Sequence, residues 1–416
     1  MFIERDILKK IVAHLDKDEI TVITGPRQVG KTTILRQLIK KVERDGMGHV
    51  YLNYDIEEDS RHLATQKSLL NKIKLECGEK GAFIFIDEIQ RKEDAGLFLK
   101  GLFDMQTTHK FIVTGSGSLE LKEKISESLT GRKRIFNVKP LSFTEFINYR
   151  TDEKYTDRLE LLFSVEPELV EELLEEYITF GGYPKVVLSD SPQEKHEVIK
   201  EIFTSTTEKD LFFLLKLNRP EAMNHMLRIL ALTAGKPVNY TWLSKETGLS
   251  LPTVKNYLYY LEKIFMVFPV YPFFKNRIKE ISKSPVLYFN DIGLCNYLAG
   301  QFKPDSSGLP GFRFQHFAWR MLTDKYEESL CSLNYWRTID KAKVDFVVNC
   351  TDKVIPWEVK YSKLKKKEVT RSMYNFIEKY NPPEAYILNR SLSETSHWGN
   401  TIINHLTVGD IIRVCL

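Results

Sequence analysis

The chain has 416 residues, of which 43% are hydrophobic and 28% are charged, and its formal net charge is +4. This length exceeds one ordinary hydrophobic core and predicts roughly two to four domains. The hydrophobic content excludes a disordered chain. The net charge is too small to indicate a nucleic-acid partner by itself, because the balance of a whole chain can conceal one basic face.

The amino-terminal residues MFIERDILKK carry acids and lysines where a secretory signal needs an apolar run. No stretch approaches the run of about eighteen apolar residues that a transmembrane helix requires. The five cysteines are scattered and form no C-x-x-C pair, which disfavours a disulfide framework and a zinc site: Cys77, Cys295, Cys331, Cys350 and Cys415. We therefore expect a cytoplasmic protein that does not bind a membrane.

Residues 1–148 alternate short apolar runs with helical stretches, a pattern typical of an α/β domain with a parallel sheet between helices. The runs are EITVITG (19–25), HVYLNYD (49–55), GAFIFID (81–87), KFIVTGS (110–116) and RIFNVKP (134–140). Residues 149–225 show an acidic, leucine-rich helical periodicity, which predicts a helical lid or linker domain.

Two further modules are expected after the helical one. Residues 226–306 indicate three short helices with a glycine turn at Gly248, then β-like residues and a connecting segment, which is the outline of a winged helix-turn-helix. Residues 307–416 place the strand-like runs NYWRTI, KVDFVVN, KVIPWEVKY and EAYILN among helices. This last module is predicted to be a small α/β domain.

A P-loop motif follows the first predicted strand. The pattern G-x-x-x-x-G-K-[ST] is matched by Gly25, Pro26, Arg27, Gln28, Val29, Gly30, Lys31 and Thr32, and the helix continues through Thr33. Its glycines let backbone N–H groups turn towards phosphate oxygens, and the helix N-terminus adds its positive dipole end. Lys31 would neutralise charge on the β- and γ-phosphates, and Thr32 would ligate Mg²⁺. The motif predicts that ATP binds here together with Mg²⁺.

The run FIFIDE (83–88) has the pattern of a Walker B strand, whose tip would reach the nucleotide. Asp87 would hold Mg²⁺ through water, and Glu88 would polarise the attacking water as a general base. An apolar strand that ends in Asp-Glu is common by itself. Its place after a P-loop favours the functional interpretation.

Two further elements have a functional and a structural interpretation. Thr114-Gly115-Ser116 ends the next strand and offers hydroxyls, of which Ser116 is the predicted nucleotide contact; the alternative is a polar turn. Arg132 and Arg134 precede the fifth strand, where a cation can serve a neighbouring subunit's nucleotide as an arginine finger. A solvated basic loop is the alternative for either residue, and we prefer Arg132 as the finger.

Several segments together resemble a known family: GPRQVGKTT, FIDEIQR, VTGSGSLEL, LTGRKRIFNVKPLSFTEF and GGYP. They are similar to the AAA-type ATPases of archaea and bacteria that carry a C-terminal nuclease-like domain of unknown function, over nearly the whole chain. The resemblance implies an AAA or STAND-like fold with strand order 5-1-4-3-2. It also implies hydrolysis that depends on oligomerisation, with Arg132 as the arginine that acts in trans.

The segment SLPTVKNYLYYLEKI (250–264) would be the recognition helix of the winged helix. Its residues Thr253, Lys255, Asn256 and Tyr259 would face a DNA groove. The alternative is a module for packing or oligomerisation, because the predicted surface is only modestly basic.

Asp345 in KVDFVV, with Glu358 and Lys360 in PWEVKY, resembles the D…E-x-K core of PD-(D/E)XK nucleases. Two carboxylates at adjacent strand ends can hold a divalent metal, and the lysine can position water. Where such families commonly place a helical glutamate this chain has Gln315, which supplies no negative charge. A surface strand without chemistry is the alternative.

A basic segment lies directly beyond this cluster and would neutralise phosphates beside it: Lys363, Lys365, Lys366, Lys367 and Arg371. A solvated lysine-rich loop is the alternative. The leading hypothesis is an oligomeric ATPase whose nucleotide state controls how the winged-helix and nuclease-like domains engage DNA or RNA, in genome maintenance or defence. The alternatives are a STAND-like regulatory ATPase that binds a protein, and a metal-dependent nuclease regulated by ATP.

Overall fold

The computed structural model describes residues 3–117, 129–207, 211, 219–274, 283–302 and 309–415. The five apolar runs of the first module form one parallel sheet in the order β2-β3-β4-β1-β5, which is the predicted order read from its other edge. Its strands are β1 (Ile20–Gly25), β2 (His49–Asn53), β3 (Phe83–Asp87), β4 (Lys110–Ser116) and β5 (Lys133–Asn137). The α/β class and the strand order are therefore confirmed for this module.

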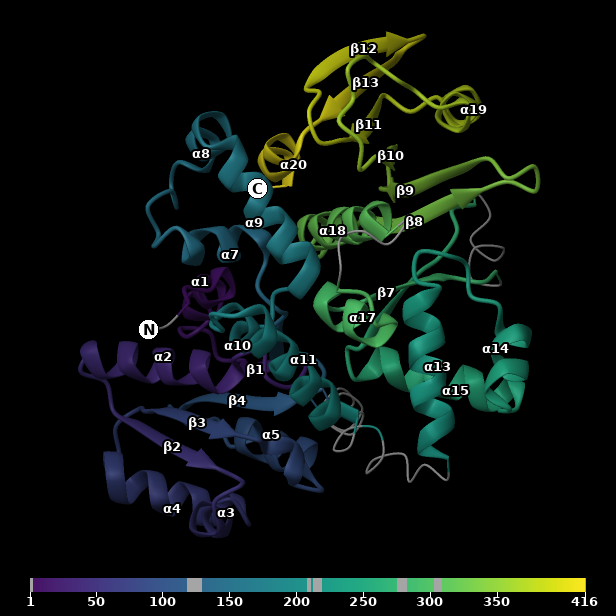
Figure 1. Ribbon diagram of the computed structural model, residues 1–416. Helices are drawn as coiled ribbons and strands as arrows, with labels where there is room; N and C mark the ends of the chain where they lie inside the picture. The colour runs from purple at the N-terminus through teal and green to yellow at the C-terminus, as the bar shows by residue number, and fades with distance from the viewer. Residues whose placement is uncertain are drawn as a thin grey trace.

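Helices cover both faces of this sheet (Figure 1). They are α1 (Asp6–Ala13), α2 (Lys31–Arg44), α3 (Glu57–His62), α4 (Gln66–Cys77), the 3₁₀ helix η1 (Ile89–Arg91) and α5 (Ala95–Asp104). On β3, Ile84 and Ile86 pack with Leu69 of α4, whereas Phe85 packs on the opposite face with Leu35 of α2. Because a central parallel strand is covered on both faces, its sequence is a continuous apolar run.

Helix α7 (Phe143–Arg150) crosses the expected end of the first module. The described part of the acidic, leucine-rich region after it forms helices, as predicted: α8 (Leu159–Val165), α9 (Pro167–Phe180), α10 (Pro184–Val187) and α11 (Pro192–Thr206). The GGYP segment turns the chain between α9 and α10. Gly181 has a φ of 79°, and a Cβ on it would lie 2.2 Å from an oxygen of Asp291. A side chain is therefore excluded at this position.

The next elements are three helices and two antiparallel strands: α13 (Pro220–Leu232), α14 (Tyr240–Thr247), α15 (Leu251–Lys263), β6 (Val267–Val270) and β7 (Val286–Phe289). Gly248 ends α14 in the left-handed conformation, at φ 63°, as the predicted glycine turn requires. Helix α17 (Ile292–Ala299) follows β7.

The C-terminal region contains a six-stranded mixed sheet in the order β12-β13-β11-β10-β9-β8. Its elements are α18 (Leu309–Tyr326), β8 (Ser332–Arg337), β9 (Lys343–Asn349), β10 (Val354–Val359), α19 (Arg371–Tyr380), β11 (Glu384–Leu388), β12 (Glu394–Trp398), β13 (Thr401–Leu406) and α20 (Val408–Cys415). The four predicted strands are β8 to β11. The hairpin β12–β13 was not predicted, because β12 is mostly exposed and has no apolar alternation.

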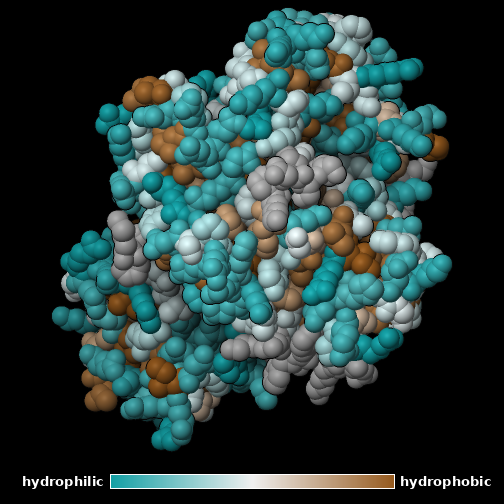
Figure 2. All heavy atoms as spheres, viewed as in Figure 1, coloured by the Kyte–Doolittle hydropathy of each residue, from teal (hydrophilic) through white to brown (hydrophobic). Residues whose placement is uncertain are grey.

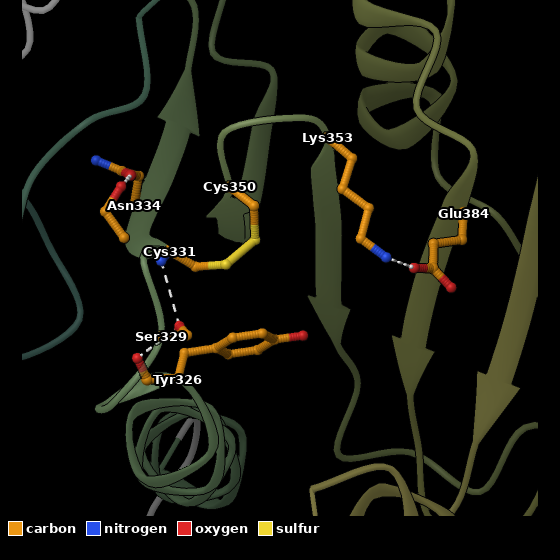
Figure 3. Close-up of a disulfide and its surroundings, with 8 residues drawn as sticks. Tyr326, Ser329, Cys331, Asn334, Cys350, Lys353 and Glu384 are labelled. Atoms are coloured by element: carbon orange, nitrogen blue, oxygen red, sulfur yellow. Dashed lines mark hydrogen bonds and ion pairs between the residues drawn. A yellow bond between two sulfur atoms is a disulfide. The ribbon is translucent and has the colours of Figure 1, made fainter.

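A disulfide joins Cys331 to Cys350, although the cysteine pattern was interpreted as disfavouring a disulfide framework, and for this pair that interpretation was wrong (Figure 3). Strands β8 and β9 pair antiparallel with Ser332 opposite Asn349, which places the two cysteines opposite each other at the next position. The odd number and wide spacing of the cysteines concealed a pair that strand register brings together. Cys77, Cys295 and Cys415 are free thiols.

The hydrophobic cores cross the predicted module boundaries. One core contains Phe146, Leu174 of α9, Phe317 of α18 and Trp357 of β10. Another runs from α2 through α11 and α15 to α17. In Figure 1, α9, α17 and α18 lie between the first sheet and the C-terminal sheet. The four domain ranges therefore remain predictions, and the modules pack as one body.

The face shown in Figure 2 carries small, separate groups of hydrophobic residues among hydrophilic ones. In the described part of the chain, no helix combines the length and the apolar character needed to cross a membrane.

Candidate functional site

The P-loop connects the end of β1 to the start of α2. Gly30 precedes α2 in the left-handed conformation, at φ 95°, and Gln28 is also left-handed, at φ 61°. Gly25 has a φ of 148°, and a Cβ on it would lie 2.1 Å from the carbonyl oxygen of Val138. These backbone angles turn the chain around the first N–H groups of α2, which lack partners within the helix.

Lys31 is buried, with 7% of its surface exposed. Its Nζ donates to the carbonyl oxygens of Gly25, at 3.1 Å, and Pro26, at 2.8 Å. Both acceptors belong to the P-loop, so the ammonium group lies against the loop that the motif assigns to phosphate. Pro26 and Val29 are buried, while Arg27 and Thr33 are half-buried.

Asp87 lies at the tip of β3 and is 2% exposed. Its Oδ2 accepts from Thr32 Oγ1 at 2.9 Å and from the Tyr51 hydroxyl at 3.4 Å, and its Oδ1 accepts from Thr114 Oγ1. Burial, together with the Asp87 charge, raises the pKa of Tyr51 to about 12, so the phenol keeps the proton it donates. The structure therefore brings the two predicted Mg²⁺ residues, Thr32 and Asp87, into direct contact.

Glu88 follows Asp87 in the left-handed conformation, at φ 58°. Its Oε2 accepts from Gln90 Nε2, which also donates to Ser116 Oγ at 3.1 Å. Gln90 thus links the predicted general base to the predicted hydroxyl at the end of β4. A left-handed glutamate is uncommon, and such angles concentrate at functional sites.

Arg132 lies at the amino ends of the parallel strands, whereas the P-loop lies at their carboxyl ends. Its carbonyl oxygen accepts from Ile20 N at 2.9 Å, at the amino end of β1, whereas the P-loop follows the carboxyl end. The two ends of a strand as long as β1 lie roughly 17–20 Å apart. Arg132 Nε contacts Asp104 Oδ1 at 2.8 Å, so it is not part of the nucleotide site of its own chain.

Other residues at the site were not found from the sequence. Two of them, Tyr51 and Gln90, contact Asp87 and Glu88 as described above. Arg5 donates to the Val29 carbonyl oxygen, and Ser205 of α11 accepts from Gln28 Nε2 at 3.1 Å. Tyr51, Arg5 and Ser205 reach the site because segments far apart in the chain become neighbours, and Gln90, two residues after Glu88, reaches Ser116 across the paired strands β3 and β4. The local pattern of residues around them carries no signal of this.

A second polar cluster lies where β9, β10 and α18 meet. Asp345 Oδ1 accepts from Gln315 Nε2 at 3.3 Å, and Asp345 Oδ2 accepts from Val359 N at 2.9 Å. Glu358 contacts Lys360 Nζ at 2.7 Å and accepts from Thr370 Oγ1 at 2.7 Å. The antiparallel pairing of β9 and β10 therefore brings the predicted D…E-x-K residues together.

In the described part of the chain, Asp345 and Glu358 are two carboxylates without a third acid arranged beside them. Among the residues that the structure describes, no group of three or more His, Cys, Asp and Glu is arranged to hold a metal. Gln315 occupies the neighbouring position with an amide. A metal at Asp345 and Glu358 remains a prediction.

Part of the basic segment is paired with acidic residues. Lys363 contacts Glu171 of α9 at 3.0 Å, and Lys367 contacts Glu394 at 3.1 Å. Lys365 and Lys366 are exposed. The segment is therefore only partly open to a phosphate-bearing partner.

The predicted recognition helix is α15. Lys255, Asn256 and Tyr259 are exposed, and Thr253 is half-buried. The Lys263 ammonium lies 5.1 Å from the centre of the Tyr259 ring. This face thus presents lysines and an aromatic ring to solvent.

Three segments of the chain match known protein families, and the match in the first module agrees with its fold. Residues 17–147 match the sequence profile of a family described as an AAA domain. Residues 171–305 and 311–407 match two families that are each described as a domain of unknown function, DUF8612 and DUF4143. Together with the strand order and the P-loop, the first match supports a nucleotide-binding, AAA-type P-loop domain.

The chain is also similar to uncharacterized proteins of other organisms. One from Methanocaldococcus jannaschii is 28% identical over 305 residues, which are 71% of this chain and 64% of that relative, so the match leaves about a third of the relative uncovered. One from Haemophilus influenzae is 26% identical over 311 residues, 72% of this chain and 74% of that relative.

Among solved structures, the replication initiator DnaA bound to AMPPCP and single-stranded DNA aligns with 63% of this chain and 90% of its own, at 14% identity and a TM-score of 0.31. DnaA from Aquifex aeolicus bound to AMPPCP aligns at 14% identity and a TM-score of 0.28, over 62% of this chain and 86% of its own. Similarity at this level supports no inference about function.

Proposed function

We propose that the protein binds ATP with Mg²⁺ at the P-loop and hydrolyses it. The observation that carries this proposal is the 2.9 Å contact between Thr32 Oγ1 and Asp87 Oδ2, beside the buried Lys31. A hydroxyl and a carboxylate are the oxygen ligands that Mg²⁺ prefers, so the residues present fit the ion. When bound, Mg²⁺ would neutralise charge on the β- and γ-phosphates.

The residues of this chain would divide the work of hydrolysis. The P-loop N–H groups and Lys31 bind the phosphates. Glu88, held by Gln90 next to Ser116, takes a proton from the attacking water. Arg132 stabilises transition-state charge on the nucleotide of a neighbouring chain, since it lies too far from the nucleotide of its own chain. Hydrolysis then requires a homo-oligomer.

We further propose that the nucleotide state controls engagement of DNA or RNA. This is supported by the exposed Lys255, Asn256 and Tyr259 of α15, and by the exposed Lys365 and Lys366 of the basic segment that follows β10 in the chain. Lysines bind phosphates, and aromatic rings stack on bases.

A regulatory ATPase that binds a protein is the second candidate. It is favoured by the acids that already pair with Lys363 and Lys367, and by Gln315 in place of a third carboxylate. DNA-stimulated ATP turnover supports the first candidate. Turnover indifferent to DNA and RNA, with an oligomer that changes with nucleotide, supports the second.

The test of ATP hydrolysis compares the wild type with Lys31→Ala and Glu88→Gln. Lys31→Ala should lose ATP binding, because the phosphate charge is no longer neutralised. Glu88→Gln should bind ATP with near wild-type affinity and hydrolyse it at least about a hundredfold more slowly, as expected for loss of a general base. Unchanged ATP affinity in Lys31→Ala would overturn the site assignment.

A further inference from the structure

Arg5 joins the P-loop to a distant segment of the chain. It precedes α1 and is 6% exposed. Its Nη1 donates to Val29 O at 3.0 Å, its Nη2 donates to Lys139 O at 2.6 Å, and its Nε contacts Glu145 Oε1 at 3.1 Å. All three nitrogens of one buried guanidinium group are therefore used, and one of them holds the P-loop.

The other two acceptors belong to the segment 139–145, which follows β5 and is itself fixed to α18. Lys139 Nζ contacts Asp324 at 2.9 Å and Glu327 at 2.7 Å. Arg320 donates to the Pro140 carbonyl oxygen at 3.0 Å and contacts Asp324 at 2.7 Å. A continuous chain of hydrogen bonds thus runs from the P-loop to α18, the helix that carries Gln315.

The position requires an arginine for a geometric reason. Its three acceptors surround a planar guanidinium group, and a lysine ammonium is a single point that cannot reach all of them. Loss of the side chain leaves Val29 O and Glu145 without this buried donor, which is unfavourable for both. The Val29 carbonyl shares its peptide plane with the N–H of Gly30, so its orientation also sets the direction of a P-loop donor.

We propose that Arg5 is a positioning residue that holds the P-loop in its phosphate-binding shape, and that ATP affinity depends on the docking of segment 139–145 against α18. The inference rests on the proposed binding of ATP at this loop. Coupling between two binding sites is reciprocal. A partner that moves α18 on binding would therefore change the affinity for ATP, and ATP would change the affinity for that partner by the same free energy.

The experiment measures the dissociation constant and the binding stoichiometry of Mg-ATP by calorimetric titration of the full chain. Arg5→Gln should raise the dissociation constant about tenfold or more, because the charged hydrogen bond to the loop is lost. Arg5→Lys should also raise it, because one ammonium group cannot hold the loop and both acceptors of segment 139–145 at once. Lys139→Met should raise it less, because its backbone carbonyl still accepts from Arg5. The matched control is Lys10→Gln. In the wild type, Lys10 of α1 forms an exposed 2.7 Å ion pair with Glu328, just after α18, and makes no contact with the P-loop in the described structure. Its loss should leave the dissociation constant for Mg-ATP unchanged.

A merely structural role would lower the binding stoichiometry, through a smaller folded fraction, and leave the dissociation constant of the remaining protein at its wild-type value. That result, or a wild-type constant in Arg5→Lys and Arg5→Gln at full stoichiometry, overturns the proposal. If the wild type itself binds no Mg-ATP, the proposed function fails instead, so the two failures are distinguishable.

Discussion

Replacing Gln315 by glutamate should create a metal site at the C-terminal cluster. Gln315 Nε2 lies 3.3 Å from Asp345 Oδ1, and Glu358 lies on the strand paired with that of Asp345. The Gln315→Glu variant would present three carboxylates where the wild type has two and an amide. Hard divalent cations prefer such oxygen ligands.

The size of the effect follows from the distance. Two unit charges 3.3 Å apart repel by about 5 kcal/mol at an effective dielectric constant of about 20. Two effects reduce this repulsion. The Lys343 ammonium group lies 3.4 Å from Asp345 Oδ1 and offsets part of the negative charge, and the new glutamate side chain can rotate away. Because position 315 is half-buried, we expect the variant to lose about 1–3 kcal/mol of unfolding free energy without metal, within the usual range for a destabilising single substitution. A bound divalent cation should restore it, by about 2.7 kcal/mol at a concentration about 100 times the dissociation constant.

The assay is urea unfolding of wild type and variant with EDTA, with Mg²⁺ and with Mn²⁺. Asn375→Asp is the control, because it makes the same change of amide to acid on the exposed face of α19. Mg²⁺ or Mn²⁺ should stabilise Gln315→Glu by more than it stabilises the wild type or Asn375→Asp. A variant whose stability does not respond to either metal would refute the placement of Gln315 beside a metal-competent carboxylate pair.

Three further predictions concern the first module. Thr32→Val removes the hydroxyl that contacts the Walker B aspartate, so Mg²⁺ should no longer strengthen ATP binding by the wild-type factor; equal Mg²⁺ enhancement in both proteins would contradict this. Gly25→Ala places a Cβ 2.1 Å from a backbone oxygen and should cost about 2 kcal/mol or more in urea unfolding, whereas Gly311→Ala, with open space around it, should cost nothing; equal stability of the two would argue against the loop geometry. Burial lowers the pKa of Lys110 from 10.5 to about 8, so between these pH values the unfolded chain binds more protons than the folded chain. The wild type should gain stability relative to Lys110→Met as the pH rises from 8 towards 10.5, and parallel stability profiles would show the reasoning to be wrong.

The P-loop and the sheet around it were predictable because their signals are local. The glycine-rich loop and the FIFIDE strand each have a short pattern with one physical cause, and buried parallel strands are continuous apolar runs. The supporting residues were not predictable. Tyr51 and Arg5 reach the site only because strands and loops far apart in the chain become neighbours, and no periodicity marks them. Gln90 follows Glu88 by two residues, but its contact with Ser116 depends on the pairing of β3 with β4.

The C-terminal region shows the same limit. The register of β8 and β9 pairs Cys331 with Cys350, and no spacing rule indicates that pair. The exposed strand β12 lacks the alternation by which strands are found. Cores shared across the expected boundaries depend on how helices such as α9 and α18 dock, which amphipathic patterns alone do not specify.

The most direct test is steady-state ATP turnover per chain, measured against protein concentration for the wild type and Glu88→Gln. We predict that wild-type turnover rises with concentration, because each nucleotide needs Arg132 of a neighbour, and that Glu88→Gln stays near background. No wild-type hydrolysis above that of Glu88→Gln at any concentration, with or without DNA, would contradict the proposal that this P-loop is an ATPase site.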